Sequence, residues 1–168
     1  MLRILVAYGS KDGGTAGLAE MIGDALADHG YDVEVLPAGK APPPEGYDAV
    51  VVAGALYANH WHRSARRYVR LHVKTLRTRP VWLVASGPLD DSARKGNLPA
   101  VPHVAELVER IGARGEVTFG GRLLPDAKGF PASVMARTHA GDWRDADHVR
   151  EFAAAVAADL AAPRAATS

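Results

Sequence analysis

Short apolar runs alternate with amphipathic stretches along the chain. The apolar runs are short and continuous, as in strands that are buried on both faces, and the stretches between them repeat apolar residues at helical spacing. The expected strands are residues 4–7, 33–36, 50–53, 81–84 and 117–119. The expected helices are residues 15–29, 63–77, 104–111 and 145–160, the last with Asp142 near its N-terminus.

Strands that alternate with helices predict a doubly wound α/β fold: a five-stranded parallel sheet with helices on both faces. In such sheets, ligands bind beyond the carboxyl ends of the strands. The loops after the first, third and fourth strands are therefore the places where function is expected. A length of 168 residues predicts one domain, over residues 1–160, followed by a frayed tail at 161–168.

The amino-acid composition limits the classes of protein to which this chain can belong. A hydrophobic fraction of 48% and a charged fraction of 23% are typical of globular domains. The absence of cysteine excludes disulfides, thiolate zinc sites, iron–sulfur clusters and cysteine nucleophiles. The longest run without a charged residue, residues 49–62, is shorter than a membrane span, and the N-terminus lacks signal-peptide features. We expect a soluble cytoplasmic protein with at most peripheral membrane contact.

The first loop has the composition of an anion-binding turn. Adjacent glycines allow backbone amides to point inward, hydroxyls and a lysine add donors, and a helix N-terminus follows. The candidate residues are Ser10, Lys11, Asp12, Gly13, Gly14 and Thr15. The loop is neither a Walker loop nor G-x-G-x-x-G, so a phosphate monoester is favoured over a nucleoside triphosphate or a dinucleotide. A plain turn with a helix cap is the alternative.

A strand followed by Ser-x-Asp-Gly-x-Thr and a helix resembles the phosphate loop of the flavodoxin-like family. The resemblance covers about residues 2–160 and implies strand order 2-1-3-4-5 and FMN as the cofactor. Asp12 stands where the family usually has threonine, and its carboxylate would be repelled by a phosphate unless it accepts backbone N–H bonds or turns outward.

The same resemblance implies that the second and third loops flank the flavin ring. The implied cofactor contacts are Ala55, Leu56, Tyr57, Ala58, Asn59, Ser86, Gly87, Pro88, Leu89 and Asp90. Tyr57 is the favoured stacking residue and Trp61 the reserve. Either aromatic residue could instead seal the end of the sheet, because large aromatic side chains pack readily.

Residues 54–62 with Ser64, Tyr68, Val69 and His72 resemble menaquinone-dependent protoporphyrinogen dehydrogenases, as does Gly141-Asp142-Trp143. This resemblance implies an FMN-dependent oxidoreductase with a quinone as acceptor. An electron-transfer protein that serves a partner redox enzyme is the alternative, and a flavodoxin-fold interaction module without FMN is a third. Residues 120–141 are shorter and less basic than the corresponding insert of those enzymes, and either cap the flavin or form a packed loop.

Charge is unevenly distributed, although the net charge is only +1. Residues 60–99 carry nine basic and two acidic side chains, and most of the basic ones form a stripe on the helix expected at 63–77. The candidate substrate or partner residues are Trp61, His62, Arg66, Arg67 and Arg70. They favour an anionic small molecule or a redox partner protein, with a solvated face as the alternative.

Other sites and partners are not expected. His60 and His62 have no third ligand close in sequence, so no metal is expected. No nucleic-acid recognition module accompanies the basic residues. No catalytic acid or base is assigned, because a flavin carries the redox chemistry itself. Homodimer formation is left open.

Overall fold

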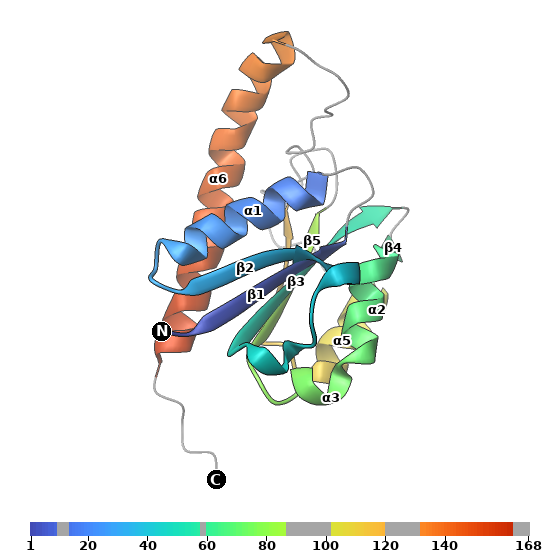
Figure 1. Ribbon diagram of the computed structural model, residues 1–168. Coiled ribbons are helices and arrows are strands. Elements are labelled where there is room, and N and C mark those ends of the chain that lie inside the picture. The colour runs from blue at the N-terminus through green and yellow to red at the C-terminus, as the bar shows by residue number, and fades with distance from the viewer. Residues whose placement is uncertain (10–13, 58–59, 87–101, 120–131, 163–168) are drawn as a thin grey trace.

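The computed structural model describes residues 1–9, 14–57, 60–86, 102–119 and 132–162 (Figure 1). The strands are β1 Arg3–Gly9, β2 Asp32–Pro37, β3 Ala49–Tyr57, β4 His60–Trp61, β5 Val81–Ser86 and β6 Gly115–Phe119. The helices are α1 Gly14–Ala27, α2 Arg63–Leu71, α3 Val73–Leu76, α5 Pro102–Ile111 and α6 Ala132–Ala161. Two short 3-10 turns, Ala38–Lys40 and Pro44–Gly46, connect β2 to β3.

The sheet has the expected topology. Its main path runs β2-β1-β3-β5-β6 with every pair parallel, and the short β4 pairs antiparallel with β3. Without β4, this is the order 2-1-3-4-5 predicted from the sequence. The doubly wound five-stranded sheet is therefore confirmed.

Helices cover both faces of the sheet, as Figure 1 shows. On one face, α1 and α6 pack through residues such as Leu18, Ile22 and Phe152. On the other face, α2, α3 and α5 pack through residues such as Val69, Leu76 and Leu107. The central strand β3 alternates between the two cores, with Val50 and Val52 in one and Val51 and Ala53 in the other. A fully apolar strand needs this burial on both sides.

The third strand is longer than predicted. The sequence pattern ends it at Ala53, whereas β3 continues to Tyr57 and turns into β4. The pairs Leu56 with Trp61 and Tyr57 with His60 extend the ladder into an antiparallel hairpin. The expectation of a loop from residue 54 was therefore wrong, because residues 54 and 55 still pair with β1 and β5, and residues 56 and 57 pair with β4, so their backbone groups are satisfied within the sheet.

Two predicted helices also differ from the structure. The helix expected at 63–77 is interrupted at His72, whose φ of −119° and ψ of 26° are not helical. The last helix begins at Ala132, so Asp142 lies within it rather than near its start. The alanine-rich segment contains no proline after Pro131, and a lone Gly141 costs only about 1 kcal/mol, which does not end a helix.

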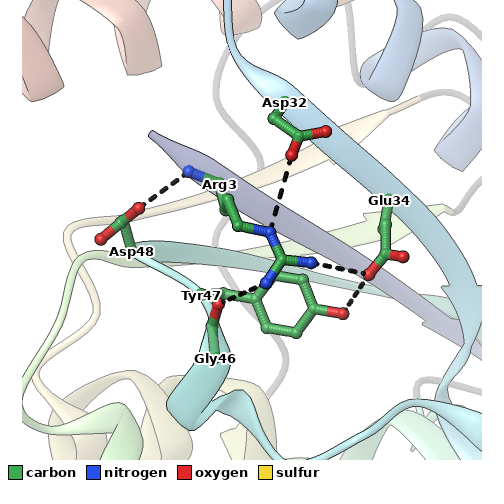
Figure 2. Close-up of polar contacts among 6 residues, drawn as sticks. All are labelled: Arg3, Asp32, Glu34, Gly46, Tyr47 and Asp48. Atoms are coloured by element: carbon green, nitrogen blue, oxygen red, sulfur yellow. Dashed lines mark hydrogen bonds and ion pairs between the residues drawn. The ribbon is translucent and has the colours of Figure 1, made fainter. Parts of the chain in front are cut away.

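A polar network ties the amino ends of β1, β2 and β3 together, opposite the carboxyl edge (Figure 2). The Arg3 guanidinium donates to the Gly46 carbonyl at 2.9 Å and lies 4.8 Å from the centre of the Tyr47 ring. The Tyr47 hydroxyl donates to Glu34, and burial together with this bond raises the pKa of Tyr47 to about 12. These contacts serve the fold rather than the expected ligand edge.

Candidate functional site

The carboxyl ends of β1, β3 and β5 meet at one edge of the sheet. Gly9 pairs with Gly54, and Gly54 pairs in turn with Ala85. One step further along, Ala55 lies beside Ser86. The three loops in which the sequence predicts function therefore leave the sheet from neighbouring positions.

The first turn of α1 has features that suit a phosphate. The helix begins at Gly14, close behind the end of β1, and its first turn contains no acidic residue. Thr15 is buried, with 2% of its surface exposed, although it is polar. Free amides and the helix dipole at such a terminus favour an anion. Of the predicted loop, Ser10, Lys11, Asp12 and Gly13 lie outside the described residues.

The other predicted cofactor contacts are described only in part. Ala55 and Ser86 are buried side by side, with 8% and 5% of their surfaces exposed, and Leu56 is half-buried. Tyr57 is the last residue of β3, and its side chain lies outside the part of the chain that the structure describes. Ala58, Asn59, Gly87, Pro88, Leu89 and Asp90 also lie outside the described residues.

Two glycines let α2 pack directly on the edge. A Cβ atom at Gly54 would lie 2.6 Å from the Trp61 Nε1 atom and 2.9 Å from the Ala65 Cβ atom. A Cβ atom at Gly9 would lie 2.5 Å from the Ser64 Oγ atom. Contacts this short do not occur between real side chains, so both positions need glycine while α2 starts where it does.

Trp61 belongs to the core. Its side chain is 1% exposed and packs over Gly54, and its indole N–H donates to the Val84 carbonyl at 3.1 Å. A ring so enclosed has no surface to offer a substrate, a partner or a flavin. The structure thus favours the alternative in which Trp61 packs at the end of the sheet. A side chain buried in this way does not belong to a surface that binds a substrate or a partner.

His62 caps α2. Its Nδ1 atom accepts from the Ser64 backbone N–H at 3.1 Å and lies 3.0 Å from the Ser64 hydroxyl. Burial lowers the pKa of His62, because an imidazolium is poorly solvated there. Its first role is therefore to begin the helix, with the ring in its neutral form.

His103 is a residue that the sequence pattern missed. It lies in the first turn of α5, and its Nε2 atom accepts from the Trp61 backbone N–H at 2.7 Å. Its ring stacks on His60, with centroids 5.5 Å apart. Burial lowers the pKa of His103, and the charges of Arg66, His60 and Arg70 lower it further against the opposing effect of Glu106. The only signal in the sequence is a histidine after the proline that opens a helix.

We expect His103 to make the fold acid-sensitive. Its pKa in the folded protein lies below the 6.5 of an unperturbed histidine, so the unfolded chain takes up a proton first as the pH falls. Stability should therefore decline below about pH 6.5 and level off once the folded form is protonated as well. His103→Gln, which keeps an acceptor but does not titrate, should lose less stability between pH 7.5 and 5.5 in urea denaturation. An equal loss in both proteins would contradict this role.

Of the three candidate arginines, two lie near His103 of α5. Arg66 and Arg70 lie close enough to His103 for their charges to act on its pKa, whereas Arg67 is exposed on the outer side of α2. The predicted set thus divides into the buried Trp61, the capping His62 and the three cations of α2. In the structure, His103 lies near two of these cations, Arg66 and Arg70, and His60 stacks on His103.

The fold and this edge define a class: a doubly wound α/β domain with a helix N-terminus suited to an anion at the carboxyl ends of its strands. A family model described as "Flavodoxin domain" matches residues 5–126, more than half of the chain. The chain belongs to this family. No curated protein matches the sequence significantly.

Solved flavodoxins share the fold along most of the chain. Flavodoxin 1 of Bacillus cereus is 16% identical over 90% of this chain and 95% of its own, with a TM-score of 0.58. Flavodoxin of Megasphaera elsdenii is 16% identical over 90% and 98%, with a TM-score of 0.61. Rubredoxin:oxygen oxidoreductase of Desulfovibrio gigas is 16% identical over 95% of this chain and 37% of its own, with a TM-score of 0.63.

The family indicates FMN as the cofactor, with an electron-transfer or oxidoreductase role. The described residues fit it: a buried threonine and a helix start without acidic residues stand where the phosphate is expected. In the described ranges, no helix is long and apolar enough to cross a bilayer. Nor do three side chains of His, Cys, Asp or Glu gather there as metal ligands would.

Proposed function

We propose that this protein transfers electrons through FMN to or from a redox partner protein. The observation that carries the proposal is the meeting of β1, β3 and β5 with the start of α1 at one edge of a flavodoxin domain. This arrangement supports the proposal because it brings the start of α1, whose free amides favour an anion, beside the ends of β3 and β5. When bound, FMN supplies the redox chemistry, so the chain has to bind it and to dock a partner.

We propose that the first loop holds the phosphate. Backbone amides of residues 10–14 and the hydroxyls of Ser10 and Thr15 would donate to it, and Lys11 would add charge. Thr15 has the clearest support, because a polar side chain in the first turn of α1 is otherwise costly to bury. The carboxylate of Asp12 has to accept N–H bonds or point away from the phosphate.

We further propose that residues 55–59 and 86–90 lie on either side of the ring. Ala55 and Ser86 are neighbours on adjacent strands, so the two loops start side by side. Trp61 is buried against Gly54 of β3, which leaves Tyr57 as the stacking candidate. Residues 1–160 would then form one FMN-binding domain.

Two measurements test this proposal. The purified protein should bind FMN and quench its fluorescence, and the dithionite-reduced, FMN-loaded protein should pass electrons to a haem protein such as cytochrome c under anaerobic conditions. Protein that stays colourless after addition of FMN would overturn the proposal. FMN binding without electron transfer to any protein acceptor would overturn the carrier role alone.

A second candidate is dehydrogenation of a porphyrinogen with a quinone as acceptor. It is favoured by the similarity of residues 54–62 and of Gly141-Asp142-Trp143 to menaquinone-dependent protoporphyrinogen dehydrogenases, and by the cations of α2, which could bind carboxylates. Under anaerobic conditions, FMN-loaded protein should then oxidise protoporphyrinogen over repeated turnovers only when a quinone is present to reoxidise the flavin. If the protein does not oxidise protoporphyrinogen but does transfer electrons to a protein acceptor, the electron-carrier function is supported and the dehydrogenase function is excluded.

A further inference from the structure

The exposed surface of α2 carries several cations that form no ion pair with any residue that the structure describes. Arg63, Arg67 and Arg70 are exposed and Arg66 is half-buried, and no acidic residue occurs between His60 and Pro80. Among the described residues, the ion pairs involve Arg3, Arg114 and Arg150 but none of the α2 arginines. These four like charges on a nine-residue helix repel one another, so an anionic surface placed against them would relieve that repulsion.

The helix is fixed to the cofactor edge. His103 lies near Arg66 and Arg70 and accepts from the backbone of Trp61, which pairs with Leu56 near the end of β3. A neutral His103 ring can accept this bond, whereas an imidazolium would present a second donor to the Trp61 N–H. His103 therefore joins α5 to the β3–β4 hairpin through a bond that needs an uncharged histidine, and α2 itself reaches the edge where Ser64 and Ala65 pack against Gly9 and Gly54.

One apolar side chain stands among the cations. Leu71, the last residue of α2, is 64% exposed, and Arg67 lies one turn before it. Met1 is the other large hydrophobic residue so exposed in the described ranges. Protein interfaces are enriched in arginine and commonly surround an apolar contact with a polar rim. This composition suits a protein surface better than a solvated helix.

The dimensions of this surface also point to a protein. Arg63 and Leu71 are about 12 Å apart along the helix axis. Lys74 on α3 and Arg77 after it continue the charge beyond the break at His72. A small molecule with one or two carboxylates would engage only part of this surface, whereas the acidic face of a folded protein could cover all of it.

We propose that the basic α2 surface, Arg63, Arg66, Arg67, Arg70 and Leu71, docks the acidic face of the redox partner beside the FMN edge. The inference rests on the proposed function, because it identifies the partner of that electron transfer. Complementary charge mainly raises the association rate and makes it dependent on salt. Docking on α2 would bring the partner next to the β3–β4 hairpin.

The test compares two electron-accepting haem proteins of opposite charge: the acidic soluble domain of cytochrome b5 and basic cytochrome c. Anaerobic stopped-flow measurements follow haem reduction by dithionite-reduced, FMN-loaded protein, one electron per ferric haem. Isothermal titration calorimetry measures binding with and without FMN. At low salt, cytochrome b5 should react faster than cytochrome c, and its rate should fall at least about tenfold between 20 and 300 mM NaCl.

Arg67→Glu should lower the rate with cytochrome b5 at least about fivefold, and Leu71→Ser should weaken its binding without changing the salt dependence. Arg110→Glu is the matched control: an exposed arginine near the far end of α5, whose reversal should leave both unchanged. An equal effect of the two arginine variants, or a preference for cytochrome c, would overturn the inference. A third outcome would also overturn it: the protein binds phosphatidylserine vesicles, Arg67→Glu abolishes that binding, and cytochrome b5 does not bind. The surface would then bind a membrane rather than a protein.

Failure of this inference is distinguishable from failure of the proposed function. FMN-loaded protein that reduces cytochrome c but shows no charge preference overturns only the docking surface. Protein that does not take up FMN overturns the electron-transfer role.

Discussion

Trp61→Ala should lower the free energy of unfolding by about 3–5 kcal/mol, the usual cost of removing a large buried aromatic side chain. The indole is 1% exposed, fills the space above Gly54 and donates to the Val84 carbonyl at 3.1 Å. Its loss would leave a cavity between β3 and α2 and remove one hydrogen bond to β5. Chemical denaturation followed by circular dichroism measures the change.

Trp61→Phe separates packing from hydrogen bonding. It keeps most of the buried surface and loses the N–H, so about 1–2 kcal/mol should be lost. If Trp61 instead contacted substrate or flavin, Trp61→Ala would remain stable and lose activity or FMN affinity. A stable Trp61→Ala protein with reduced FMN binding would therefore contradict the core assignment.

Combining Gly14→Ala with Thr15→Val should weaken FMN binding at least about tenfold, which corresponds to about 1.4 kcal/mol. The substitutions remove a hydroxyl from the buried first turn of α1 and add a methyl group where the backbone is expected to approach the phosphate. Fluorescence titration with FMN and with riboflavin measures the effect. Riboflavin, which has no phosphate, should bind both proteins about equally.

Thr75→Val serves as the control for that change. Thr75 also has a bonded hydroxyl, which donates to Glu45 at 2.6 Å, but it lies on α3, away from the carboxyl edge. FMN affinity should not change in this variant. An unchanged affinity in the double variant of residues 14 and 15 would mean that the phosphate binds elsewhere.

The sheet was predictable because its strands are buried on both faces. Burial forces continuous apolar runs such as Val50 to Ala53, and their alternation with helices leaves few topologies. The hairpin from β3 to β4 was not predictable, because Trp61 and His60 pair with β3 through backbone groups that leave no pattern in the sequence. The break at His72 likewise has no glycine or proline to indicate it.

The candidate site was predictable only where local chemistry defines it. The adjacent glycines 13 and 14 at the start of a helix predict an anion site without knowledge of the fold, and that site stays a prediction. The role of His103, in contrast, depends on a contact over 42 residues of sequence, and the burial of Trp61 depends on a missing side chain at Gly54. Both are properties of packing between elements that no local pattern contains.

The tight seating of α2 on Gly9 and Gly54 links residues that are far apart in the sequence. A larger side chain at Gly54 requires a smaller one at Trp61 or Ala65, and one at Gly9 requires Ser64 or His62 to retreat. Homologous proteins that carry alanine at either glycine should therefore show compensating exchanges at those partners. Such paired changes would indicate, for each homologous protein, how far α2 lies from β1 and β3.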